Sequence, residues 1–143
     1  MYTKQHKRSP EYDLYKAIAI YLRLQYPNVM YHFDPTGLSL TKTQAGKLKA
    51  IQGGPGYPDL FIIHPNGKYH GLFIEIKPEG TRIFKNNGLV FVNEHIQQQS
   101  EFMIKLHKSG YYAVFACGFD DAKKTIDDYL RPGTWKDTNV KKC

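Results

Sequence analysis

The chain has 143 residues, 41% of them hydrophobic, so it is long enough for one domain with a buried core. It contains no run of about 18 apolar residues, which excludes a membrane-spanning helix, and no apolar segment follows the basic N-terminus in the manner of a signal peptide. The formal net charge of +7 favours a polyanionic partner. Cys117 and Cys143 are not expected to form a disulfide, which favours a reducing cytoplasm.

The first half of the chain predicts a helix, a short strand and a basic segment. Ser9-Pro10-Glu11 is typical of a helix start, and apolar residues then recur at helical spacing until Pro27. A strand is predicted at 29–33 and a turn at 34–37, while 41–51 predicts either a short basic helix or an ordered loop. Gly53-Gly54-Pro55-Gly56 is interpreted as a flexible hinge.

The second half predicts further strands and two helices. In chain order we expect strands at 60–64 and 72–77, a small hairpin from 82–84 and 89–92, a helix at 94–108, an uncharged central strand at 111–117 and a helix at 120–130. This order predicts a mixed α/β layer domain over residues 9–130, with a basic arm at 1–8 and a basic tail at 131–143.

Basic residues gather in the two terminal segments and in the segment 41–51. Such clusters around a nearly neutral core are typical of a surface that follows nucleic-acid phosphates. For the terminal runs, an alternative as solvated tails without a binding role remains open. The candidate nucleic-acid-binding residues are Lys4, Lys7, Arg8, Lys42, Lys47, Lys49, Lys141 and Lys142.

Asp59 directly precedes an apolar strand and follows a proline in a glycine-rich turn. In such a turn an aspartate often only bonds its own backbone. On the next strand, Glu75 and Lys77 share one face because strand side chains alternate. Two carboxylates brought close together repel unless a cation lies between them, and hard oxygen ligands favour Mg²⁺ or Mn²⁺. Lys77 then has the charge to polarise a water or balance a phosphate.

Two polar residues on apolar helix stripes are further candidates. Gln99 lies on the stripe of the 94–108 helix and needs a hydrogen-bond partner there, and His95 one turn earlier can border the same site. Glu11 lies on the stripe of the first helix, although an acid in a first turn is also favoured by the helix dipole.

These residues together resemble the VRR-NUC (virus-type replication-repair nuclease) branch of the PD-(D/E)xK phosphodiesterases. The matching pattern is Glu11 on the first helix, Gly56-x-Pro58-Asp59-Leu60, Glu75-x-Lys77, and Gln99 on a helix that ends near Gly110. The likeness covers about residues 9–130. The segment 78–92 departs from it, since it is longer than the link usual in the family.

The resemblance implies a restriction-endonuclease-like core with a mixed central sheet flanked by helices. It implies that Asp59, Glu75 and the backbone carbonyl of Ile76 are metal ligands, that Glu11 assists a metal directly or through water, that Lys77 orients or polarises the attacking water, and that Gln99 helps to position Lys77 and the water.

We therefore expect a Mg²⁺- or Mn²⁺-dependent DNA endonuclease that is selective for four-way junctions or other branched DNA, and acts in replication, recombination or repair. A homodimer is expected because a two-fold symmetric junction requires two symmetric cuts. The resemblance implies the cytoplasm of a bacterial or phage-infected cell. Two alternatives remain open: a non-catalytic DNA-binding module with a nuclease fold, and a restriction-type nuclease that reads a short sequence.

Overall fold

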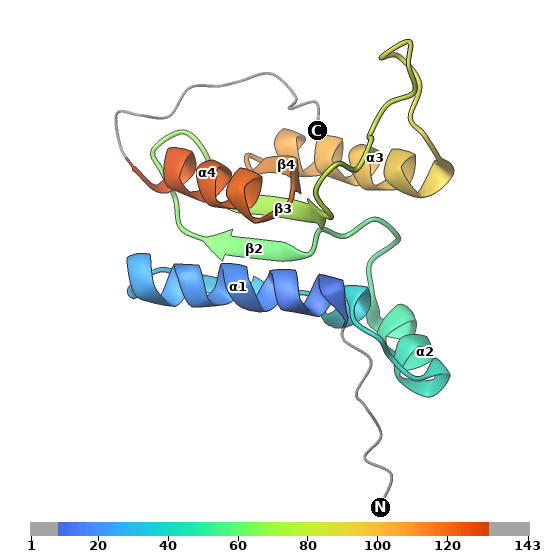
Figure 1. The fold of residues 1–143 in the computed structure, drawn as a ribbon, viewed down its shortest axis with the longest axis horizontal. Coiled ribbons are helices and arrows are strands. Elements are labelled where there is room, and N and C mark those ends of the chain that lie inside the picture. The colour runs from blue at the N-terminus through green and yellow to red at the C-terminus, as the bar shows by residue number, and fades with distance from the viewer. Residues whose placement is uncertain (1–8, 132–143) are drawn as a thin grey trace, which may run out of the picture.

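The computed structural model describes residues 9–131, which form a sheet covered by helices on both faces (Figure 1). Its elements are α1 (Pro10–Gln25), β1 (Met30–Phe33), the short 3-10 helix η1 (Pro35–Gly37), α2 (Lys42–Ile51), β2 (Leu60–Ile63), β3 (Leu72–Lys77), α3 (Glu94–Lys108), β4 (Tyr112–Cys117) and α4 (Phe119–Leu130). The candidates Lys4, Lys7, Arg8, Lys141 and Lys142 lie outside the described residues.

Side-chain caps fix where the first two helices begin. The Ser9 hydroxyl accepts a hydrogen bond from the backbone of Tyr12, which starts α1 as predicted. The segment 41–51 is a helix and not a loop, because Thr41 and Gln44 form a reciprocal capping box.

Within residues 9–131 the sheet has four strands in the order β1-β2-β3-β4. β1, β2 and β3 pair antiparallel, whereas β3 and β4 pair parallel and are connected through α3. The prediction that the uncharged strand is central is therefore wrong, because β4 lies at the edge of the sheet. It is buried nevertheless, since α3 and α4 both pack against it.

Two apolar layers hold the helices to the sheet, and alternation along β3 divides them as predicted. Leu72, Ile74 and Ile76 join the layer under α1 and α4, while Phe73 joins the layer under α3. Glu75 and Lys77 extend from the same face as Phe73, so the α3 side of β3 becomes polar where the strand ends.

The segment between β3 and α3 forms the predicted hairpin only in part. Its two limbs pair antiparallel through one isolated bridge, between Phe84 and Phe91, but they contain no strand. The backbone N–H of Lys85 donates across the turn to the carbonyl of Val90, and the Asn87 Oδ1 accepts from the N–H groups of Leu89 and Val90.

Two expectations about the environment of the chain are addressed by the structure. Among residues 9–131 no helix combines the length and apolar character required to cross a bilayer. Cys117 is disulfide-bonded, contrary to prediction, and Cys143 lies outside the described residues.

Candidate active site

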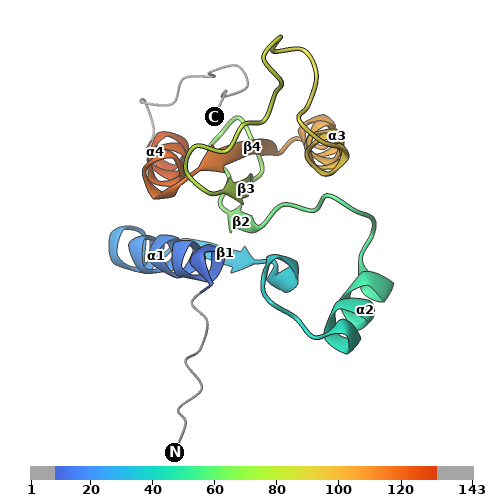
Figure 2. The same ribbon diagram turned by 45° about the vertical axis from the view of Figure 1, so that its right-hand side comes forward.

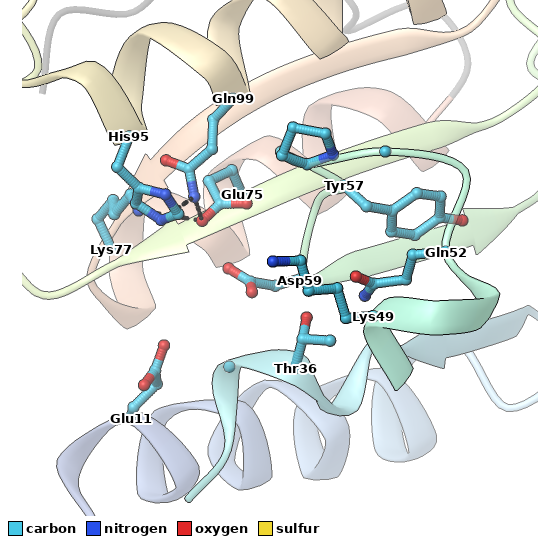
Figure 3. Close-up of a pocket in the computed structure, with 14 residues that line it drawn as sticks. Glu11, Thr36, Lys49, Gln52, Tyr57, Asp59, Glu75, Lys77, His95 and Gln99 are labelled. Carbon is cyan, nitrogen blue, oxygen red and sulfur yellow. Dashed lines mark hydrogen bonds and ion pairs between the residues drawn. The ribbon is translucent and has the colours of Figure 1, made fainter. Parts of the chain in front are cut away.

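The predicted catalytic side chains meet in one pocket at the end of β3, whereas Ile76 is not among the residues that line it. This cavity of about 600 Å³ is lined by Asp59, Glu75, Lys77, Gln99 and Glu11 among others (Figure 3). These side chains come from segments that are far apart in sequence: α1, the start of β2, the end of β3 and the first half of α3. Lys49 and His95 also line the pocket.

Asp59 is held rigidly at the start of β2. Its side chain is only 7% exposed, and its Oδ2 accepts a hydrogen bond of 2.7 Å from the backbone N–H of Ile76 on the neighbouring strand. The backbone carbonyl of Asp59 accepts a hydrogen bond of 2.7 Å from the N–H of Asp34. This bond attaches the turn after β1 to the segment that carries Asp59. Burial raises the pKa of the Asp59 carboxyl, although hydrogen bonds from Tyr15 and Ile76 act in the opposite direction.

Glu75 is the central residue of the pocket and is 3% exposed. Its Oε1 accepts from Lys77 Nζ at 3.0 Å and from Gln99 Nε2 at 2.6 Å. Burial and the negative charge of Asp59 raise the pKa of Glu75 to about 8, and these two effects outweigh the ion pair with Lys77. The pocket therefore favours a negative charge on Glu75 only when further positive charge is supplied.

Gln99 lies on the buried stripe of α3, as its helical spacing predicts, and is 4% exposed. Its Nε2 contacts both Glu75 Oε1 and, at 3.1 Å, the Nε2 of His95. Because the amide nitrogen donates both hydrogens, His95 Nε2 accepts in this arrangement. Gln99 and Lys77 both donate to the same oxygen of Glu75, so this carboxylate links the two side chains.

Two buried acceptor atoms in the pocket lack a donor. Within residues 9–131, neither Glu75 Oε2 nor Gln99 Oε1 has a hydrogen-bond partner. A buried polar atom without a partner costs about 1–3 kcal/mol, and native proteins contain few of them. Gln99 Oε1 is an acceptor, and Glu75 Oε2 is an acceptor when its carboxyl group is ionised, so the ionised pocket is suited to a cation or to a water molecule that donates.

Glu11 approaches the pocket from the first turn of α1. Its Oε1 accepts from the Tyr15 hydroxyl at 3.3 Å, and Tyr15 also hydrogen-bonds Asp59. Partial burial and the charge of Asp59 raise the pKa of Glu11. Burial and the same carboxylate strongly raise the pKa of Tyr15, so its hydroxyl stays protonated as a donor between the two acids.

Two glycines explain how the chain approaches so closely here. A Cβ at Gly37 would collide with the Tyr15 hydroxyl and lie 3.2 Å from Glu11 Oε1 and 3.3 Å from Asp59 Oδ1. Gly56 has a φ of 87°, and a Cβ there would lie 2.7 Å from the carbonyl oxygen of Gln98. Gly56 is therefore a packing contact with α3, whereas a Cβ at Gly53 or Gly54 would meet no described atom within 4 Å, so a flexible hinge in this segment remains a prediction.

Sequence reasoning missed several residues that border the pocket. Tyr57 packs edge-on against Phe73 and Phe102, with ring centroids 5.8 and 5.5 Å away, and lines the opening beside Asp59. Thr36 and Gln52 line it from η1 and the end of α2. The only sequence signal for Tyr57 is its position next to Pro58-Asp59.

The basic candidates that the structure describes all lie on α2. Lys42, Lys47 and Lys49 are exposed along this helix, and Lys49 reaches the pocket. α2 thus brings predicted phosphate-binding charge to the edge of the predicted catalytic residues (Figures 1 and 3).

The side chains that could serve as metal ligands fit a hard cation, but they are few. In the part of the chain from 9 to 131, no group of three or more His, Cys, Asp or Glu side chains is arranged to hold a metal. A metal here would depend on Asp59 and Glu75 together with backbone or water oxygens. The unpartnered Glu75 Oε2 beside a second carboxylate fits this arrangement, since open positions filled by water are typical of Mg²⁺ sites.

The arrangement of fold and pocket is that of a nuclease-fold domain with a restriction-endonuclease-like core. A solved structure described as a VRR_NUC domain protein matches this chain with a TM-score of 0.61 and 28% identity, and the match covers 87% of this chain and 90% of that chain. This confirms the resemblance of the chain to the VRR-NUC family. No protein-family model matches the chain, and no curated protein matches it.

Proposed function

We propose that this protein is a metal-dependent DNA endonuclease that hydrolyses phosphodiester bonds. The observation that carries the proposal is the environment of Glu75: its Oε1 is held by Lys77 and Gln99, while its buried Oε2 has no partner within residues 9–131 and lies in a pocket shared with Asp59. Similarity to a VRR_NUC domain protein supports a DNA-processing role.

Asp59, Glu75 and the carbonyl of Ile76 would hold Mg²⁺ or Mn²⁺, with Glu11 assisting from α1. Such an ion, when bound, stabilises negative charge on the phosphate and lowers the pKa of a bound water. The backbone N–H of Ile76 fixes the orientation of Asp59, and Gln99 fixes that of Glu75. These contacts prepare the ligand geometry before the substrate arrives.

Lys77 is assigned to the attacking water. Its Nζ is held 3.0 Å from Glu75 Oε1 at the edge of the pocket, and the lysine is partly exposed. A positive charge at this place favours a hydroxide-like water and balances the phosphate. The unpartnered Gln99 Oε1 is an acceptor that can orient the same water.

The preferred substrate in this proposal is branched DNA such as a four-way junction, cut by a homodimer. The support is the resemblance to the VRR-NUC family together with the two-fold symmetry of a junction. The basic face of α2 supplies phosphate contacts next to the pocket. The rival proposals are a DNA-binding module that does not cut and a restriction-type enzyme that reads a short sequence.

A cleavage panel tests the proposal. Junction, flap, single-stranded and duplex DNA are incubated with the protein, with and without Mn²⁺. We expect metal-dependent cleavage that is fastest on the branched substrates. Equal cutting of junction and linear duplex would favour the restriction-type enzyme, and binding without a cut at every metal concentration would favour the module.

The variant Asp59→Ala tests the assigned centre. Losing a ligand should lower the cleavage rate by several orders of magnitude while DNA affinity stays close to that of the parent. The matched control is Glu101→Ala, which removes an exposed carboxylate from α3 that bonds only Gln97 among the described hydrogen bonds. Parental cleavage by Asp59→Ala would show that the chemistry occurs elsewhere.

A further inference from the structure

The loop 78–93, which joins β3 to α3, is an ordered projection that the catalytic site does not use. Ile83 at its base is buried in the apolar layer under α3. The rings of Phe84 and Phe91 stack with centroids 4.9 Å apart and tie the two limbs together. The base of the loop is therefore anchored to the core, which holds the tip in one place.

The tip of this loop presents apolar side chains to solvent on a fixed turn. Leu89 is 84% exposed and Val90 is 48% exposed. The backbone N–H of Lys85 donates to the carbonyl of Val90 at 2.7 Å, and Asn87 Oδ1 accepts from the N–H groups of Leu89 and Val90. An exposed leucine on a turn that is already ordered loses little conformational entropy when it binds.

The same loop is basic and contains no acidic residue between Glu79 and Glu94. Arg82, Lys85, Asn86 and Asn87 line a shallow hollow of about 570 Å³. The Arg82 Nη1 donates to Asn86 Oδ1 at 2.8 Å, which orients the guanidinium toward this group. A hollow with two cations and amide donors is complementary to a phosphate.

Both ends of the loop are attached to the catalytic pocket. Lys77 directly precedes the loop and His95 follows it by two residues, and both line the cavity. In Figures 1 and 2 the loop and α2 project on opposite sides of the sheet, at the end where β3 finishes. Two basic segments therefore flank the pocket: α2, and the stretch 80–93 of the loop, neither of which contains an acidic residue.

We propose that the loop 78–93 is a second DNA-binding arm that acts opposite α2. Arg82 and Lys85 bind a backbone phosphate of duplex DNA, and Leu89 inserts between neighbouring base pairs. Inserted apolar wedges of this kind unstack a base step and bend DNA, which branch points and flexible steps permit most readily. The proposal rests on the proposed nuclease function only for the identity of the ligand.

The charge component is tested by equilibrium binding, without metal, so that no cleavage is required. Anisotropy of a labelled four-way junction and of a matched duplex is measured over a range of salt concentrations. Arg82→Ala combined with Lys85→Ala should lower affinity about tenfold near 0.1 M salt and reduce the salt slope by about 1, as expected for the loss of one phosphate contact. The control is Lys105→Ala with Lys108→Ala, which removes the same charge from the last turn of α3 and should change the slope by less than half as much.

The insertion component is tested with 2-aminopurine placed at the branch point and, separately, within the duplex. The parent should increase the fluorescence of this base analogue, which reports unstacking, and Leu89→Ser should abolish most of the increase. Ile104→Ser, which replaces an exposed apolar residue of α3 outside the loop, should behave like the parent.

The outcomes test the DNA-binding arm and the proposed nuclease function separately. Unchanged affinity and salt slope for the Arg82 and Lys85 variant would overturn the arm, and unchanged fluorescence for Leu89→Ser would overturn insertion. A parent that binds no DNA would overturn both components. A parent that binds but never cuts refutes catalysis alone, and the loop variants then still decide the arm.

Discussion

The surroundings of Glu75 disfavour a negative charge on its carboxyl group. Two donors hold one of its oxygens, yet its pKa is raised to about 8 because burial and Asp59 oppose its charge. A structural ion pair would be expected to lower the pKa of a carboxyl group. The opposite shift supports the proposed binding of a cation beside Glu75, since perturbed acids in clefts are typical of functional sites.

The raised pKa of Glu75 predicts that ionising this residue lowers the free energy of unfolding, and that Glu75→Gln removes this pH-dependent loss. The unfolded carboxyl titrates near 4.5 and the folded one near 8, so between these values only the folded state keeps the proton. Without a metal, the stability of the parent should therefore fall as pH rises from 4.5 to 8. Above pH 8, Glu75 should contribute no further change. The variant should gain up to a few kcal/mol relative to the parent by pH 8.

Denaturant unfolding of both proteins in the presence of a chelator, from pH 5 to 9, measures this difference. Titrating groups that do not interact with Glu75 are common to both proteins and cancel in the comparison, whereas Asp59 does interact with Glu75 and contributes to the measured difference. Added Mn²⁺ should then stabilise the parent more than the variant, because only the parent retains both carboxylates. Two parallel stability curves would show that Glu75 does not titrate in this range.

Gly56→Ala should damage both the fold and the site. The alanine would need a φ of 87°, and its Cβ would press on the backbone of α3 at Gln98. We expect a loss of about 1–3 kcal/mol in unfolding free energy together with slower cleavage, because the same loop positions Asp59 opposite Gln99.

Gly53→Ala is the matched control for this substitution, since a Cβ at Gly53 meets no described atom within 4 Å. Thermal unfolding and cleavage rates of the two variants give the comparison. Equal behaviour of both variants would show that the contact between Gly56 and α3 has no energetic role.

At the scale of elements, α2 differs from the other helices of the described chain. None of its residues is fully buried, whereas α1, α3 and α4 each bury several. Short helices without tertiary packing are marginal in water, so its capping box carries much of its stability. The helix that presents Lys42, Lys47 and Lys49 is thus held mainly at its beginning.

Thr41→Ala should therefore loosen α2 without unfolding the domain. Losing the cap costs about 1 kcal/mol locally, so amide hydrogen exchange within α2 should accelerate several-fold while global stability stays unchanged. DNA affinity should fall modestly because the lysines lose their fixed positions. Thr43→Ala, in the same helix but outside the cap, is the control, and equal exchange in both variants would contradict the role of the cap.

At the scale of the whole domain, Asp127 joins α4 to the end of α1. Its Oδ1 accepts from the hydroxyls of Tyr21 at 2.5 Å and Tyr26 at 2.6 Å, and its Oδ2 accepts from Lys123 at 2.8 Å. Burial acts to raise the pKa of Asp127, but these hydrogen bonds outweigh it and lower the pKa. The contact lies at the opposite end of α1 from Glu11.

Asp127→Ala should reduce stability by about 2–3 kcal/mol, because two tyrosine hydroxyls lose their acceptor. The lowered pKa implies that the stabilisation is present above the ordinary aspartate pKa of 3.8 and is lost as pH falls through the folded value. The cleavage rate of the folded protein should not change.

Unfolding at pH 7 and pH 3 measures this effect, with Asp128→Ala as control. Asp128 pairs with Lys124 on an exposed surface, so its removal should change stability by no more than about 1 kcal/mol. A strong effect of Asp127→Ala on cleavage at temperatures where the variant is folded would show that this end of the domain is coupled to the pocket.

The sequence by itself determined most of the helices and strands and several of the residues that line the candidate pocket. Periodicity placed β3 and α3 at their observed bounds, because alternation and the Gln99 stripe reflect which faces are apolar. The Asp59 and Glu75 pattern was readable because the metal chemistry proposed for this site would restrict residue types and spacing. The domain limits and the roles of these residues remain predictions.

Only the tertiary structure decided the features that depend on neighbours distant in sequence. The sequence of β4 predicts a central strand because both of its faces are buried. Burial of the faces does not reveal whether a second strand pairs with its outer edge, and here none does among the described residues. The contact of Gly56 with α3, the Tyr15 hydroxyl between two acids and the unpartnered Glu75 Oε2 arise from segments far apart in the chain. Local propensity carries no information about such contacts, since the free energy that fixes them comes from packing between elements.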